Sequence, residues 1–202
     1  MALTKSVAAV DEWASVTQNT TREGAVVDIS AVYASALHIQ MALDSATAHT
    51  GTEIIVQVSS NTTGDEDWEE LMRWVGPTGT SVTENIVDNP LAAGSQAIAL
   101  ADTTGYTVNG EYRFIKDGTI ANSEIFFQKD MTPHNGGNGS VTAIDGTTNA
   151  HATATPIWSI AKTWAITIPI EFNRVRVVYD NTHDVDGSSV ACKCRISKVT
   201  AL

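Results

Sequence analysis

Strict alternation of apolar and polar side chains is the feature that most constrains how this chain can fold. Successive side chains of a β-strand point to opposite faces, so a stretch with a period of two can bury one face and expose the other. Val175, Val177 and Tyr179, for example, alternate with Arg174 and Arg176. We expect a strand in each stretch with this pattern: 36–43, 53–59, 164–170, 173–180 and 190–197.

The composition also favours strands. Charged residues make up only 17% of the chain, and Thr, Ser, Ala, Val and Ile are abundant instead. Of these, the β-branched side chains fit well on a pleated sheet. Segments rich in Asn, Asp and Gly separate the alternating stretches and favour turns. The sequence therefore predicts an all-β protein, namely a β-sandwich of the jelly-roll or immunoglobulin-like kind.

One segment, DWEELMRWV at 67–75, follows this period less well. Trp68, Leu71, Met72 and Val75 recur at helical spacing, whereas the neighbouring segments all have the strand pattern. We expect either a strand or a short helix at an edge of the sandwich.

The middle of the chain has shorter and more closely spaced strand patterns, which are typical of a small barrel or a curled sheet. We predict that an inserted, small β-barrel-like module at 79–158 divides the sandwich into a first half at 25–78 and a second half at 159–202. Such an insertion is tolerated because the ends of a domain usually lie close together at its surface.

The first 24 residues precede the clearest strand patterns and are expected to form an N-terminal arm. Val7, Val10, Trp13 and Val16 are spaced along it, either on a short amphipathic helix or on an extended segment. An arm of this kind can add to the sheet of a neighbouring subunit. We therefore expect deletion of residues 1–20 to weaken assembly and to leave the fold intact.

No catalytic motif is present in the sequence. The five histidines are scattered, and there is no HExxH, P-loop, GxGxxG or GxSxG pattern. Cys192 and Cys194 fall on the same face of an expected strand, a spacing that rarely satisfies disulfide geometry, so we expect two buried thiols. The chain is thus predicted to be no enzyme and to hold no cofactor.

A few residues are candidates for metal-binding, sugar-binding or glycosylation sites. Asp180, Asp184 and Asp186 precede Gly187 in a pattern that resembles a calcium loop, but the bidentate Glu of such loops is missing, and a polar turn is the simpler interpretation. Trp68 is a candidate platform for a sugar ring or a core residue. Asn19, Asn61 and Asn138 begin glycosylation sequons that matter only if the protein is extracellular.

The net charge of −11 disfavours a nucleic-acid partner, because phosphate contacts need a basic face. The N-terminal segment lacks the apolar core of a secretory signal, and no stretch approaches the roughly 20 apolar residues of a membrane span. We expect synthesis in a bacterial cytoplasm without a signal peptide, no membrane partner, and a final location in a virion or an extracellular assembly.

Two segments at either end of the predicted sandwich, LHIQMALDSATAHTGTEIIVQVSSNTTGDEDWEEL and NRVRVVYDNTHDVDGSSVACKCRISKV, resemble proteins encoded among tailed-bacteriophage virion genes. The middle segment, with its TTGY turn at 103–106 and its TNAH stretch at 148–151, resembles a small β module found in phage structural proteins. The resemblance implies a structural role as a capsid decoration, tail or fibre component, and it implies no catalytic residues.

The leading hypothesis is therefore a non-enzymatic, self-assembling virion component whose partners are copies of itself and other virion proteins. Its contacts would form through sheet faces and an exchanged N-terminal arm. Two alternatives remain open at this point. One is the protomer of an extracellular filament, and the other is a glycan-binding β-sandwich module.

Overall fold

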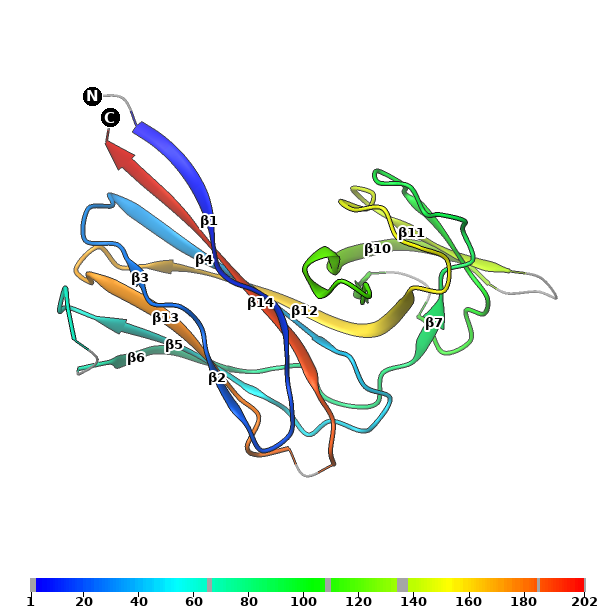
Figure 1. Cartoon of the computed structure of the whole chain (residues 1–202), viewed down its shortest axis with the longest axis horizontal. Coiled ribbons are helices and arrows are strands. Elements are labelled where there is room, and N and C mark those ends of the chain that lie inside the picture. Colours follow the sequence, from blue (N-terminus) through cyan, green and yellow to red (C-terminus); the bar gives the residue numbers. More distant parts are fainter. Residues whose placement is uncertain (1–2, 65–66, 108–109, 134–137, 185, 202) are drawn as a thin grey trace.

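The computed structural model describes residues 3–64, 67–107, 110–133, 138–184 and 186–201 (Figure 1). In these ranges the chain is all-β, and its only helical element is a short 3-10 turn, η1 (Ile120–Asn122). The strands are β1 (Leu3–Val16), β2 (Thr21–Glu23), β3 (Val27–Asp28), β4 (Ala34–Leu43), β5 (Glu53–Ser59), β6 (Glu69–Val75), β7 (Thr83–Asn85), β8 (Ala97–Leu100), β9 (Glu111–Ile115), β10 (Glu124–Thr132), β11 (Gly139–Ala143), β12 (Pro156–Ile168), β13 (Arg174–Asp180) and β14 (Val190–Ala201).

The strands form two antiparallel sheets, which confirms the predicted β-sandwich. The larger, nine-stranded sheet has the order β1-β14-β4-β12-β9-β10-β11-β8, with β7 also paired to β12. The smaller, five-stranded sheet has the order β2-β13-β5-β6, with β3 also paired to β13. Strands from the beginning and the end of the chain lie side by side, because β14 and β12 pair with β4, and β13 pairs with β5.

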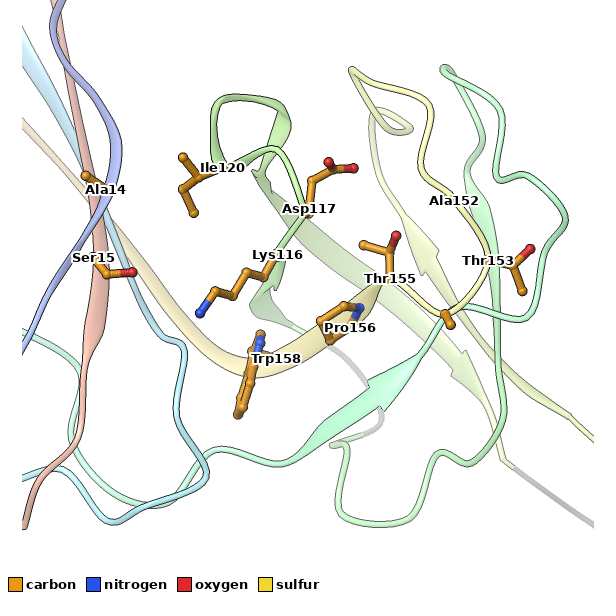
Figure 2. A pocket seen from close by; sticks show the side chains of 12 residues that line it. Ala14, Ser15, Lys116, Asp117, Ile120, Ala152, Thr153, Thr155, Pro156 and Trp158 are labelled. Carbon is orange, nitrogen blue, oxygen red and sulfur yellow. The ribbon is translucent and has the colours of Figure 1, made fainter.

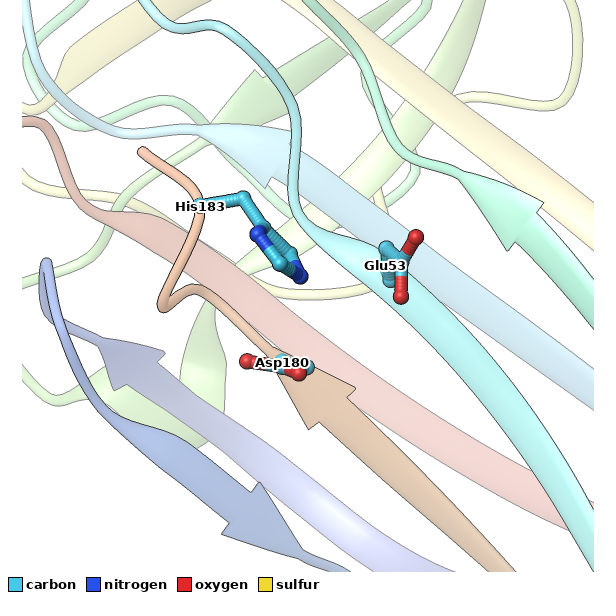
Figure 3. Close-up of side chains that lie close together, drawn as sticks. All are labelled: Glu53, Asp180 and His183. Atoms are coloured by element: carbon cyan, nitrogen blue, oxygen red, sulfur yellow. The ribbon is translucent and has the colours of Figure 1, made fainter. Parts of the chain in front are cut away.

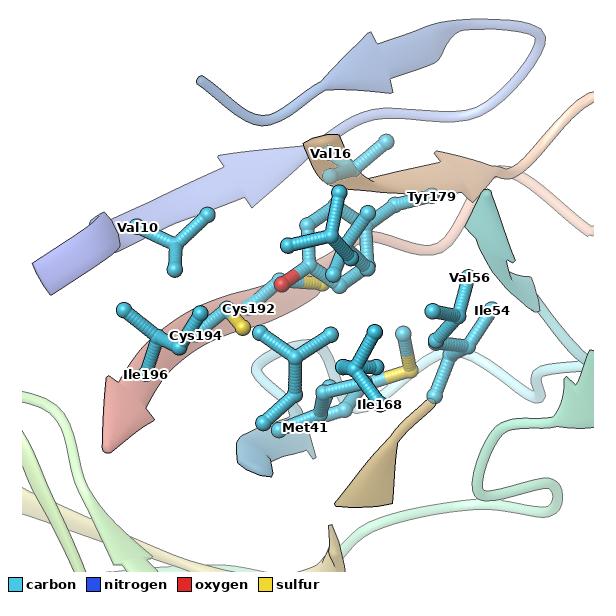
Figure 4. Packing of buried hydrophobic residues seen from close by; sticks show 14 of the residues in the cluster. Val10, Val16, Met41, Ile54, Val56, Ile168, Tyr179, Cys192, Cys194 and Ile196 are labelled. Carbon is cyan, nitrogen blue, oxygen red and sulfur yellow. The ribbon is translucent and has the colours of Figure 1, made fainter. Parts of the chain in front are cut away.

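The core of the sandwich is built from the faces that the period-two pattern predicted (Figure 4). Leu37, Ile39 and Met41 of β4 are completely buried, and so are Cys192 and Cys194 of β14. Side chains of β5 and β13 cover them from the second sheet. The apolar alternation of the sequence extends beyond the end of β12. Ile168 is buried, but Ile170 lies after the strand and is 71% exposed.

The segment 79–158 has a core of its own, which includes Ile98, Leu100, Phe126 and Val141. Its strands extend the larger sheet through the pairing of β9 with β12, and the strand order ends at β8. No closed barrel is present in the part of the chain that the structure describes, so the module is an open sheet. β12 runs from this module into the sandwich without a break (Figure 1), and the boundary expected at residue 158 falls inside it.

The N-terminal segment differs from the expected free arm, because β1 is a strand of the larger sheet. It pairs with β14 of its own chain from Leu3↔Ala201 to Val16↔Val190. Two register shifts interrupt this pairing, one between Ala9 and Asp11 and one between Asp11 and Ala14. Bulges add residues without a partner and re-aim side chains, so Val10 and Val16 reach the sandwich core while Trp13 packs among the residues at the junction with the module.

A bulge also accounts for the ambiguous segment around Trp68. The segment forms strand β6, and its pairing with β5 is interrupted between Val56 and Gln57. Leu71 and Trp74 both pack against the sandwich core although they are three residues apart. The extra residue of the bulge thus places two core-facing side chains three positions apart, which is a spacing typical of one face of a helix.

Apolar and charged contacts join the module to the sandwich. The rings of Trp13 and Phe114 lie with their centroids 4.8 Å apart. Beside them, the carboxylate of Asp44, whose side chain is fully buried, accepts a hydrogen bond from the Lys116 ammonium at 2.8 Å. The hydroxyls of Ser15 and Ser189 also donate to it, at 2.9 and 2.5 Å. A buried carboxylate requires such partners, and these come from β1, the end of β9 and the start of β14.

The role of β1 in the core predicts how two truncations behave. Removing residues 1–16 takes away Val10, Trp13 and Val16, each of which contributes about 1.5–3 kcal/mol through burial, and uncovers β14. We expect the free energy of unfolding to fall by about 5 kcal/mol or more, a large part of a typical total. Cys192 and Cys194 should then react with a thiol reagent under native conditions.

The matched control removes residues 1–9, whose described side chains are all exposed. We expect its denaturation midpoint and thiol reactivity to stay close to those of the full chain. Full-chain stability of the 1–16 truncation would show that β1 is a detachable arm after all.

Candidate assembly surface

The outer edge of β1 is an exposed strand edge at one end of the larger sheet. β1 ends the order of the larger sheet, so in the described part of the chain only its inner edge has a partner strand. All residues from Leu3 to Ala9 are exposed, and Leu3 and Val7 are 63% and 59% exposed. An unpaired row of backbone N–H and C=O groups with apolar side chains beside it is a template for pairing with another chain.

This stretch also lacks most of the features that protect natural sheet edges. Bulges, prolines and inward-pointing charges discourage edge-to-edge pairing. Both register shifts of β1 lie after Ala9, so the pairing of Leu3–Ala9 with β14 is regular, and Lys5 is its only charged residue. The exposed half of β1 is therefore competent to accept a further strand.

The four residues predicted to make contacts from an arm have different surroundings. Val10, Trp13 and Val16 are 5%, 3% and 2% exposed and pack inside their own chain, so in this conformation they cannot contact a neighbour. Val7 remains exposed on the free half of the strand. The sequence pattern did not distinguish these cases, because the bulges that separate them carry no clear sequence signal.

A second apolar surface lies near the same end of the sandwich. Tyr33 and Ile170 are 51% and 71% exposed and line a shallow pocket of about 390 Å³ with residues 30–32. The backbone N–H of Tyr33 donates to the carbonyl of Val199 at 2.8 Å, and Val199 pairs with Lys5 of β1. These side chains therefore flank the exposed β1–β14 ribbon.

A pocket of about 820 Å³ lies between the module and β1 (Figure 2). Its walls come from residues 14–15, 116–120 and 152–158. The charged groups among them already have partners, since Lys116 is paired with Asp44 and Asp117 with His151. Trp158 forms one wall, and its buried indole N–H has no hydrogen-bond partner among the residues that the structure describes. The pocket offers shape and apolar surface rather than a reactive group.

A Ser, a His and an Asp side chain lie together beneath the β13–β14 loop. The imidazole of His49 contacts the hydroxyl of Ser188, and Asp184 accepts the Ser188 hydroxyl at 2.8 Å. The side chains of His49 and Asp184 have no exposed surface, and Ser188 is 1% exposed, so no substrate can reach the hydroxyl. Burial lowers the pKa of His49. The cluster fastens two loops and is not a catalytic triad.

The structure does not gather the three aspartates of the expected calcium loop. Asp184 belongs to the buried cluster. Burial alone would raise the pKa of its carboxyl group, but the hydrogen bonds from Ser188 and Thr50 outweigh burial and lower this pKa. Asp186 is exposed, and the carboxylate of Asp180 accepts hydrogen bonds from Thr182 and Thr21. Among the described residues, the one group of three possible ligands is formed instead by Glu53, Asp180 and His183.

The remaining sequence candidates are placed as follows. Trp68 is covered by the guanidinium groups of Arg174 and Arg176, 4.9 and 4.4 Å from its ring centroid, a cation–π arrangement that occupies the surface a sugar would need. Asn19, Asn61 and Asn138 are all exposed, and their glycosylation stays a prediction. Both cysteines are free and buried as expected, and burial raises the pKa of Cys194 to about 12. No helix in the described ranges is long and apolar enough to cross a membrane.

His151 lies between two carboxylates of the module. Its Nδ1 lies 3.0 Å from Asp117 and its Nε2 lies 2.7 Å from Glu124, and its own side chain is fully buried. An imidazolium donates from both ring nitrogens, so the charged form of His151 is the one that suits two carboxylate neighbours. Burial alone would lower the pKa of His151, but the bonds to Glu124 and Asp117 outweigh it and raise the pKa.

Glu124 completes this ion pair. Burial raises its pKa, but hydrogen bonds from His151 and from the backbone N–H groups of Thr148 and Asn149 outweigh this and lower it. The carboxylate therefore ties the start of β10 to the loop before β12. No local sequence pattern indicates this cluster, because its members come from three separate segments.

These opposite shifts predict a pH dependence. A raised pKa of His151 stabilises the fold fully below about pH 6.5, the usual value for histidine, and this contribution is lost as the pH rises through the raised pKa. The lowered pKa of Glu124 stabilises the fold above the ordinary value of 4.5, and this contribution is lost as the pH falls through the lowered pKa. We expect His151→Gln to reduce the free energy of unfolding by about 2–3 kcal/mol near pH 6 and by less at alkaline pH.

Chemical denaturation across this pH range measures the difference between the two proteins. His38→Gln is the matched control, because His38 is exposed. A His151→Gln deficit that stays constant between acidic and alkaline pH would contradict a charged imidazole at this position.

Comparisons with known proteins add little to this geometry. No family model and no curated protein matches the chain. Among solved structures it is similar to infectious bursal disease virus, Gx strain, with 10% identity and a TM-score of 0.25 over 99% of this chain and 42% of that chain. A structure of T=1 particles derived from the same virus gives 11% identity and a TM-score of 0.25 over 98% of this chain and 40% of that one. The chain thus spans about two fifths of these structures, and likenesses at such TM-scores carry no argument about fold or function.

Proposed function

We propose that this chain is a non-enzymatic structural subunit that assembles with copies of itself, as a virion component of the tailed-bacteriophage type. The observation that carries the proposal is the exposed and regular outer edge of β1 at Leu3–Ala9. The virion setting rests on the sequence resemblance of the sandwich and module segments.

The contact that fits this edge is strand addition by a second copy. Two β1 edges related by a two-fold axis pair antiparallel, and each then satisfies the free backbone groups of the other. If the axis passes near Ser6, Lys5 lies opposite Val7 rather than opposite the second Lys5, so the pairing avoids a like-charge contact. The apolar side chains of Leu3 and Val7 add buried area to the backbone hydrogen bonds.

An exchanged arm is the other way in which β1 could join two copies. Exchange would place β1 of one copy on β14 of another and would preserve the burial of Val10, Trp13 and Val16. The hinge for such a movement is the short turn between β1 and β2, and its backbone is fastened to Asn181 through Asn19 and Thr20. We therefore favour addition at the edge over exchange of the strand.

A charge at the centre of the edge tests the proposal. Val7→Lys leaves the core unchanged, because Val7 is 59% exposed, but in this register it brings a second ammonium group opposite Lys5 of the other copy. We expect self-association to weaken at least tenfold, equivalent to about 1.4 kcal/mol, as measured by sedimentation velocity over a concentration series. Negative-stain micrographs of the same samples distinguish closed oligomers from filaments.

Ile144→Lys is the matched control, since Ile144 is an apolar residue of the module with 45% exposure. It should associate as the unaltered chain does. Equal association of the Val7→Lys variant, or an unaltered chain that stays monomeric at high concentration, would contradict assembly through the β1 edge.

A further inference from the structure

We propose that Glu53, Asp180 and His183 form a binding site for a first-row divalent cation, with Zn²⁺ as the best-fitting ion. One carboxylate oxygen of each acid and one nitrogen of the imidazole all lie within 4.8 Å of one another. Figure 3 shows the three side chains converging from β5, from the end of β13 and from the loop that follows β13. The site is independent of the proposed assembly.

The two carboxylates are brought together by the register of the smaller sheet. Glu53 and Asp180 are directly opposite each other in the antiparallel pair β5–β13. Like charges at such positions repel each other and destabilise a sheet. Arg73 pairs with Glu53, but in the described part of the chain no Lys or Arg forms an ion pair with Asp180. A divalent cation between the two acids would turn this repulsion into attraction.

The backbone around His183 is held on both sides. Before it, the carboxylate of Asp180 accepts hydrogen bonds from the backbone N–H of Thr182 at 3.0 Å and from its hydroxyl at 2.6 Å. After it, Asp184 is fixed in the buried cluster with Ser188. The Thr50 hydroxyl also donates to the His183 carbonyl at 3.4 Å. The imidazole is therefore presented from a fixed position, and rotation of its exposed side chain can close the remaining distance to a bound ion.

The donor set selects the kind of ion. Ca²⁺ and Mg²⁺ prefer oxygen ligands alone, whereas an imidazole favours zinc and its neighbours in the first transition row. Zinc accepts nitrogen and carboxylate ligands at about 2.0–2.2 Å, and three protein ligands leave a position for water. The oxygen of Asp180 that bonds Thr182 and the oxygen of Glu53 that bonds Arg73 are occupied, but each carboxylate has a second oxygen for the metal.

Competing sites on the described surface are few. The side chains of His49 and His151 are fully buried, and both cysteines are buried thiols with raised pKa values. His38 is exposed, but it lines a shallow pocket together with Arg195, whose charge repels a cation. His38 therefore provides a matched control for His183.

The test is calorimetric titration of the full chain with Zn²⁺ after treatment with a chelator, together with thermal unfolding with and without the ion. We expect one strong site for each chain and a rise in the melting temperature at saturation, because an ion that binds only the folded state stabilises it. His183→Ala and Asp180→Asn should each weaken the binding at least tenfold, while His38→Ala should bind as the unaltered chain does.

Asp180→Asn keeps the oxygen that accepts the hydrogen bonds of Thr182, so it separates ligation from folding. Without metal, this variant should stay folded and melt close to the unaltered chain, because the hydrogen bonds from Thr182 are kept. Unchanged Zn²⁺ affinity in His183→Ala would overturn the proposal. So would Ca²⁺ binding that exceeds Zn²⁺ binding, or loss of Zn²⁺ binding in His38→Ala.

Discussion

The hydrogen bonding of one long strand, β12, holds the two parts of this protein together. Its first residues pair with β7 and β9 of the module, and its later residues pair with β4 of the sandwich. Ile157 lies in the core of the module and Ile168 in the core of the sandwich. Because backbone pairing continues across the junction, the module cannot turn without breaking the larger sheet. The Asp44–Lys116 ion pair and the Trp13–Phe114 contact fix the same junction from the side of β1 and β9.

Period-two alternation was sufficient to predict most strands of the sandwich and the buried face of each. The prediction succeeded for β4, β5, β13 and β14 because each is regular along its length and buries one face against a single core. It was incomplete where a strand contains a bulge. In β1 and β6 the extra residue of a bulge places buried side chains three positions apart instead of two. From periodicity alone, this spacing suggests a helix in the β6 segment and a helix or an extended arm in the β1 segment.

The polar clusters could not be predicted from the sequence for a different reason. His49 and Asp184 are far apart in the sequence, and His151 is far from both Asp117 and Glu124. Local patterns contain no information about such pairs, because sheet register and loop packing decide which side chains meet. The three aspartates before Gly187 illustrate this point: their spacing suggested one common loop, but packing placed Asp184 under the loop with His49 and left Asp180 opposite Glu53.

The two halves of β1 explain how one strand can serve both stability and assembly. Its second half is bulged, and it commits Val10, Trp13 and Val16 to the interior, so leaving its place would expose apolar surface. Its first half is regular and exposed on both faces, so accepting another strand there costs no internal contact. Because the interior half anchors the strand, the exposed half is presented in an extended and already paired form. Less conformational entropy is then lost on association than a disordered arm would lose.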